Sequence, residues 1–167
     1  MLIYAHRGAS ADFPEGTKAA YEAAITQGAD GFECDVRLSK DQQIICYHDS
    51  NTSRLSGVNL EIAKTDYAKL KAEVNPYLLS ELLDLAIANK KNLAIETKHP
   101  VPTGGLIEKM VHQLLVSKEN QIKASGISIS IMSFSWFATQ RNILAGHESV
   151  YLCLLYTSPS PRDVEES

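Results

Sequence analysis

Two carboxylate side chains, Glu33 and Asp35, stand two residues apart inside the apolar stretch GFECDVRLSK. This stretch has the composition of a buried strand, and alternate side chains of a strand point to the same face. Glu33 and Asp35 therefore share a face, and so do Glu96 and Lys98 in the later stretch LAIETK. Converging carboxylates raise one another's pKa unless a cation lies between them, and oxygen ligands suit hard divalent ions. The carboxylates of Glu33, Asp35 and Glu96 thus predict a site for Mg²⁺ or Ca²⁺.

The same three carboxylates also have a purely structural explanation. Arg7 or Arg37 could pair with the first two, and Lys98 could pair with the third. A lone E-x-D pattern would favour this explanation. Three carboxylates with two histidines at neighbouring strand ends favour the metal site instead.

The two histidines are His6 and His48, each placed directly after a short apolar run. Two imidazoles beside one site supply a general acid and a general base near neutral pH. Arg7 and Lys98 add positive charge suited to a phosphate, since arginine binds it in a bidentate manner and lysine as a point charge. A divalent metal, two histidines and two cations together favour hydrolysis of a phosphate ester over acyl or hydride transfer. We expect structural roles for the remaining histidines, His99, His112 and His147.

The elements that position these residues alternate between strands and helices. We expect strands in the apolar runs at residues 2–5, 30–39, 42–50, 93–98, 126–134 and 149–155. We expect helices at residues 17–29, 66–74, 81–92, 104–122 and 136–146, with Thr17 and Ser80 as N-caps. This order favours a parallel sheet with crossover helices, either an open doubly wound sheet or part of a (β/α)₈ barrel with about five of its eight strands. The polar residues follow the strands, as active-site residues of barrels do.

Short motifs with a fixed order run through most of the chain. They are AHRGAS (5–10), PEGT (14–17), FECDVRLSKD (32–41), HD (48–49), YLLSELLDLA (77–86) and IETK (95–98). In this order and at these spacings they resemble the glycerophosphodiester phosphodiesterase family, from the N-terminus to about residue 150. The family usually has asparagine where this chain has Gly16, so we expect a less rigid loop there with the chemistry intact.

The resemblance implies a TIM (β/α)₈ barrel, here truncated at its C-terminal side, and hydrolysis of glycerophosphodiesters to sn-glycerol 3-phosphate and an alcohol. The implied site residues are Glu33, Asp35 and Glu96 for a divalent metal, Mg²⁺ or Ca²⁺, His6 and His48 as the acid–base pair, and Arg7 with Lys98 for the phosphate. Because the last barrel strands carry substrate contacts in the family, we expect activity from the intact protein and none from the 167-residue chain alone. Two alternatives stay open: a related lipid-headgroup phosphodiesterase, phospholipase C-like or sphingomyelinase D-like, and a barrel that binds without catalysis.

The end of the chain differs from the rest. From Thr157 onward the sequence is polar, contains prolines and lacks periodicity. We therefore expect the domain over residues 1–150. Over residues 151–167 we expect either a disordered tail or an artefactual extension, and we favour the second.

Composition and charge argue against several function classes. The net charge is −4, and Lys and Arg are scattered along the sequence, which argues against nucleic acid as a partner. No apolar run approaches the roughly 20 residues of a membrane span, and the first residues lack the pattern of a secretory signal. We expect a cytoplasmic protein whose partner is a small-molecule glycerophosphodiester.

Overall fold

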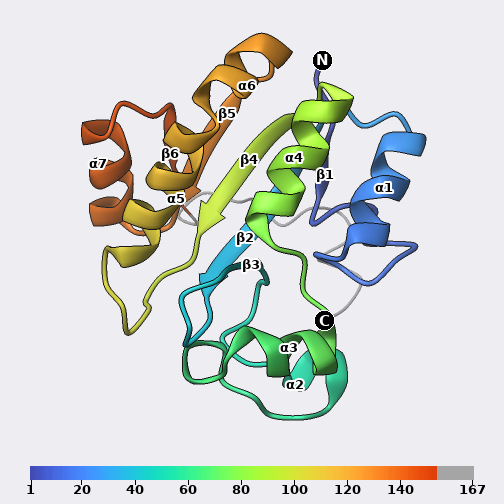
Figure 1. The fold of residues 1–167 in the computed structure, drawn as a ribbon, viewed down its shortest axis with the longest axis vertical. Coiled ribbons are helices and arrows are strands. Elements are labelled where there is room, and N and C mark those ends of the chain that lie inside the picture. Colours follow the sequence, from blue (N-terminus) through green and yellow to red (C-terminus); the bar gives the residue numbers. More distant parts are fainter. Residues whose placement is uncertain (154–167) are drawn as a thin grey trace.

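A six-stranded sheet forms the centre of the computed structural model, which describes residues 1–153 (Figure 1). Its strands are β1 (Tyr4–His6), β2 (Gly31–Leu38), β3 (Ile44–Cys46), β4 (Asn92–Thr97), β5 (Ile129–Ser133) and β6 (Ser149–Tyr151). The order β1-β2-β4-β5-β6 is parallel throughout, which confirms the predicted parallel sheet. β3 differs, since it pairs antiparallel with β2 and forms a hairpin with it. Most of the tail expected over residues 151–167 lies outside the described residues.

Helices connect the parallel strands, and Figure 1 shows α4 lying across β2 and β4. The helices are α1 (Lys18–Thr26), α2 (Ser53–Ser56), α3 (Tyr67–Val74), α4 (Leu79–Asn89), α5 (Leu106–Ser117), α6 (Glu119–Ser125) and α7 (Trp136–Leu144), with the 3₁₀ helix η1 (Ile62–Lys64). The single helix predicted over residues 104–122 is wrong, because Lys118 adopts a φ of −112° and a ψ of 11° and divides it into α5 and α6.

The N-terminal caps of two helices test the sequence predictions. Thr17 caps α1 as predicted, because its Oγ1 accepts a hydrogen bond from the N–H of Ala20 at 3.3 Å. Ser80 does not cap α4, which begins one residue earlier. There the Glu81 carboxylate accepts the N–H of Leu78 at 3.2 Å and satisfies the helix end instead.

The sheet has an apolar face and a polar face along β2. Phe32, Cys34 and Val36 are fully buried in the core that the sheet shares with the helices. The side chains between them, Glu33 and Asp35, point to the opposite face. The alternation of side chains along a strand predicted this arrangement. The arrangement separates both carboxylates from the core that faces the helices.

Residues 50–76 form a small layer beside the hairpin of β2 and β3, at the lower end of the view in Figure 1. The core of this layer consists of Ile45, Tyr47, Ile62 and Leu70. Their packing holds η1 and α3 against the hairpin, although the sequence predicts only one helix in the segment. The layer also places α2 near the carboxyl end of β3.

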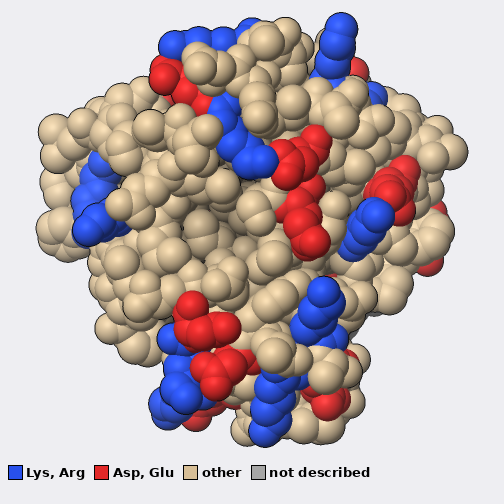
Figure 2. Space-filling view, in the orientation of Figure 1, with Lys and Arg blue, Asp and Glu red and all other residues tan. Residues whose placement is uncertain are grey.

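The surface carries charges of both signs. Figure 2 shows Lys and Arg side chains beside Asp and Glu on the face drawn, without one large patch of a single sign. None of the helices in residues 1–153 is long and apolar enough to cross a lipid bilayer.

Candidate active site

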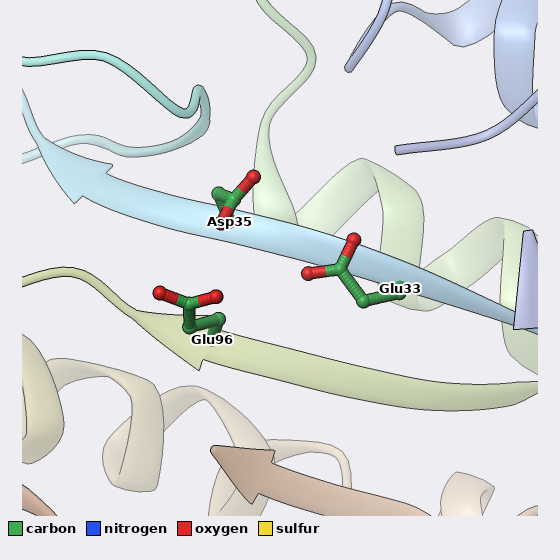
Figure 3. Close-up of side chains that lie close together, drawn as sticks. All are labelled: Glu33, Asp35 and Glu96. Atoms are coloured by element: carbon green, nitrogen blue, oxygen red, sulfur yellow. The ribbon is translucent and has the colours of Figure 1, made fainter. Parts of the chain in front are cut away.

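The three predicted metal ligands come together on two neighbouring strands. Glu33 and Asp35 lie on β2 and Glu96 lies on β4, where the parallel register pairs the Cα atoms of Asp35 and Glu96. Figure 3 shows the three carboxylates clustered over these strands, and their ligand oxygens lie within 4.8 Å of one another. Each residue is at most 9% exposed. The structure thus brings the three side chains together, as a shared site requires.

Two cations accompany the carboxylates, as the structural explanation also predicted. Arg7 Nε lies 2.7 Å from Asp35 Oδ2, and Lys98 Nζ lies 2.9 Å from Asp35 Oδ1 and 2.7 Å from Glu96 Oε1. Neither contact with Asp35 has the alignment of a hydrogen bond, so both of its buried oxygens lack a hydrogen-bond partner among the described residues. Buried oxygens with unused lone pairs are suitable ligands for a hard cation. The donor set therefore fits Mg²⁺ or Ca²⁺.

Glu33 carries an electrostatic cost in this cluster. Burial, followed by the nearby charge of Asp35, raises the pKa of Glu33 from 4.5 to about 7. The N–H of Arg7 donates to Glu33 Oε2 at 3.2 Å and compensates only in part. Without a metal ion, Glu33 thus holds a proton near neutral pH that a bound cation would displace.

This raised pKa predicts how the stability of the metal-free protein depends on pH. The folded state binds the Glu33 proton more tightly than the unfolded state does, so stability falls as the pH rises from 4.5 through 7. The loss is up to about 3 kcal/mol. Thermal unfolding in a chelator at pH 5 and pH 8 measures it, and saturating Mg²⁺ or Ca²⁺ is expected to remove it.

The matched variants are Glu33→Gln and Glu22→Gln. Glu33→Gln is expected to flatten the pH dependence, whereas the exposed Glu22 on α1 is expected to leave it unchanged when replaced. If metal-free wild type and Glu33→Gln lose the same stability between pH 5 and pH 8, the predicted cost of ionising Glu33 is wrong.

The two predicted histidines flank the cluster from separate strand ends. His6 Nε2 lies 3.7 Å from Glu33 Oε2, and burial followed by the charge of Arg7 lowers the pKa of His6. His48 Nδ1 lies 2.7 Å from Asp49 Oδ1, which fixes the orientation of the ring. His48 lines a small pocket together with Arg7 and Asp35, so it lies on the same side of the sheet as the cluster.

A chain of alternating charges links the carboxylate cluster to His48. Its members in order are Asp35, Arg7, Glu15, Arg54, Asp49 and His48. Arg7 Nη1 lies 3.2 Å from Glu15 Oε1, and Arg54 Nη2 lies 2.5 Å from the same oxygen. Arg54 Nε lies 2.6 Å from Asp49 Oδ2. We call this set the charge chain.

The sequence analysis missed three members of the charge chain, namely Glu15, Arg54 and Asp49. Glu15 and Asp49 lie inside the motifs PEGT and HD, so their motifs marked them without giving them a role. Arg54 lies on the short helix α2, in a segment without periodicity. The hydrogen bond between Glu15 and Arg54 lowers the pKa of Glu15 and raises the pKa of Arg54, so both side chains stay charged.

Gly16 lies where the chain departs from the usual family motif. Its φ of +69° is in the left-handed region, and an added Cβ would lie 2.9 Å from the carbonyl oxygen of Cys46. Its N–H donates to the carbonyl of Arg7 at 3.0 Å, and its carbonyl accepts the N–H of Tyr77 at 3.3 Å. Glycine therefore permits a close backbone contact between this loop and the end of β3.

Comparison of the sequence with known proteins gives a consistent result. Residues 6–163 match the "Glycerophosphoryl diester phosphodiesterase family". A Mycobacterium tuberculosis protein named "Probable glycerophosphodiester phosphodiesterase 1" is 36% identical over 133 residues, which are 68% of this chain and 48% of that protein. The chain spans about half the length of this relative and of two other curated relatives.

Comparison with solved structures gives the same family. A glycerophosphodiester phosphodiesterase of Thermotoga maritima matches 99% of this chain and 68% of its own, with a TM-score of 0.75 and 26% identity. An Oleispira antarctica phosphodiesterase, solved with its product sn-glycerol-3-phosphate, matches 99% of this chain and 70% of its own, with a TM-score of 0.71 and 23% identity. The parallel sheet thus matches the TIM-barrel fold of these phosphodiesterases, of which the chain covers about two-thirds. With the motifs, the sheet and the clustered carboxylates in agreement, the chain belongs to the glycerophosphoryl diester phosphodiesterase family.

Proposed function

We propose that the intact protein carrying this domain hydrolyses glycerophosphodiesters to sn-glycerol 3-phosphate and an alcohol, with Mg²⁺ or Ca²⁺ as cofactor. The observation that carries the proposal is the cluster of Glu33, Asp35 and Glu96, whose oxygens lie within 4.8 Å of one another beside two cations and two histidines. The names of the family and of its relatives support the substrate class.

The residues of the chain have distinct tasks in this reaction. A divalent ion on the three carboxylates would offset negative charge on the phosphate oxygens. Arg7 and Lys98 both contact Asp35, so their positive ends lie beside the metal ligands and bind the phosphate. His6 and His48 act as general base and general acid: one takes the proton of the attacking hydroxyl or water, and the other protonates the leaving alcohol. Asp49 holds Nδ1 of His48, which leaves Nε2 to face the substrate.

The test is hydrolysis of glycerophosphocholine by the intact protein, followed as release of glycerol 3-phosphate. We expect release with Mg²⁺ or Ca²⁺ and none after chelation. Lysophosphatidylcholine is assayed in parallel, because cleavage of that lipid alone would favour a lipid-headgroup phosphodiesterase. A folded, metal-loaded protein that cleaves neither compound would contradict the proposal and favour a binding role.

Arg54 gives a further prediction for this reaction. Arg54→Met removes the cation between Glu15 and Asp49, so Arg7 and His48 lose their common support. We expect kcat to fall about 10–100-fold, a loss typical of supporting residues around a site. The affinity for the metal is expected to stay unchanged, because Arg54 touches none of the three carboxylates.

The matched control is Arg141→Met, since Arg141 also pairs with a glutamate (Nη2 to Glu108 Oε2, 3.1 Å) but lies outside the site. We expect Arg54→Lys to recover part of the loss, and the pH profile of kcat to shift in Arg54→Met only. Equal losses in Arg54→Met and Arg141→Met would mean that Arg54 contributes general stability and does not position the site.

A further inference from the structure

A cavity of about 280 Å³ lies at the carboxyl end of β2, where it is lined by Arg37, two residues after Asp35. The end of β2 and the segments that follow β3 and β4 contribute walls of this cavity. The walls include Arg37 at the end of β2, Asn51 after β3 and Pro100 after β4. Asn59 and Glu61, from the small layer, contribute a further wall. We call this space, which is lined by a residue of the same strand as Glu33 and Asp35, the β2–β4 cavity.

Arg37 is the charged residue that joins the β2–β4 cavity to the site. Because alternate residues of a strand share a face, Arg37 lies on the same face of β2 as Glu33 and Asp35. Its Nε donates to the backbone carbonyl of His48 at 2.8 Å. Among the described residues, no side chain forms an ion pair or hydrogen bond with Arg37, so its Nη groups keep their donors for a ligand.

The other lining groups define which ligand the cavity suits. Arg37 supplies donors only, and the amide of Asn59 supplies donors and an acceptor. Oδ1 of Asn51 accepts the N–H of Ser53 and Oε2 of Glu61 pairs with Lys64, so Asn51 offers its amide N–H groups and Glu61 offers Oε1. Hydroxyl groups donate and accept, so a polyhydroxylated group satisfies this mixture. None of the described residues that line the cavity is aromatic, so it lacks the rings that bind quaternary ammonium groups.

We propose that the β2–β4 cavity is the subsite for the leaving alcohol and that it takes a polyhydroxylated alcohol, such as inositol or glycerol, in preference to choline. This inference rests on the proposed function and adds the substrate class to it. Arg37 is the specificity-determining residue, because it reaches the alcohol while its Nε holds the segment that carries His48.

The test compares kcat/KM for glycerophosphoinositol with that for glycerophosphocholine in the intact, metal-loaded protein. We expect a preference for glycerophosphoinositol of about tenfold or more, as hydrogen-bonding sites give. Arg37→Met and Asn59→Leu are expected to reduce this ratio, Arg37→Met the more strongly. Asn59→Leu leaves the bond from Arg37 to His48 in place, and Asn120→Leu on the exposed face of α6 is its matched control.

The ratio separates specificity from a general loss of activity. Equal losses for both substrates in Arg37→Met, or a wild type that prefers glycerophosphocholine, would overturn the inference and leave the proposed function standing. If the wild type cleaves neither substrate, the proposed function fails. Binding of free myo-inositol against choline, measured by ligand-observed NMR with wild type and Arg37→Met, then decides the inference by itself. Binding of inositol that Arg37→Met abolishes supports it, and equal or absent binding overturns it.

Discussion

Replacing Asp35 with asparagine is expected to lower the affinity for Mg²⁺ or Ca²⁺ by about 100-fold or more, a larger loss than supporting residues around a metal cause. The reason is electrostatic. Once Glu33 has given up its proton to allow metal binding, three ionised carboxylates stand against the two positive charges of Arg7 and Lys98, which leaves one net negative charge for the metal. Asparagine at position 35 removes that charge and one ligand oxygen together. Isothermal titration with either ion measures the change.

Asp66→Asn is the matched control, because Asp66 is exposed and pairs only with Lys40 at 3.6 Å. It is expected to bind the metal as the wild type does. Asp35→Asn that folds and binds with an unchanged Kd would show that Asp35 is an ion-pair partner of Arg7 and Lys98 and not a metal ligand.

Replacing His48 with alanine is expected to lower kcat for glycerophosphodiester hydrolysis by about 10²–10⁴-fold, the range for loss of a general acid or base. The imidazole has no substitute on its side of the cluster, since its neighbour Asp49 is already bonded to Arg54. The affinity for the metal is expected to stay within a few-fold, because His48 contacts none of the carboxylate ligands. Rate and titration measurements on one preparation separate the two effects.

The control for this change is His112→Ala. His112 also bonds to another side chain (Nδ1 to His147 Nε2, 2.8 Å), but it lies on α5 outside the site. His112→Ala is expected to keep the wild-type rate. A His48→Ala protein with nearly normal kcat would remove His48 from the proposed acid–base pair and leave His6 as the candidate.

The period of two in a strand explains why the core of the site could be predicted. Glu33 and Asp35 had to share a face, and so did Glu96 and Lys98. What the sequence could not give was the register that places Asp35 opposite Glu96, since this depends on β2 and β4 being neighbours. The family resemblance supplied that adjacency.

Other features left no local trace in the sequence. Arg54 reaches Glu15 across 39 positions, and a contact of that range depends on how the small layer packs on the hairpin. The break between α5 and α6 at Lys118 has neither proline nor glycine to mark it. The apolar run of β3 indicated a strand, but periodicity does not distinguish an antiparallel hairpin arm from a parallel strand.

The charge chain also limits how this site can change over evolutionary time. Arg54 forms ion pairs with both Glu15 and Asp49, so the loss of any one of the three side chains changes the energetic effect of replacing the other two. Their substitutions are therefore epistatic, and a second change can cost little once the first has occurred. A lineage that alters one of them gains most by altering its partner as well, so the three positions are constrained as one unit although they lie on three separate segments.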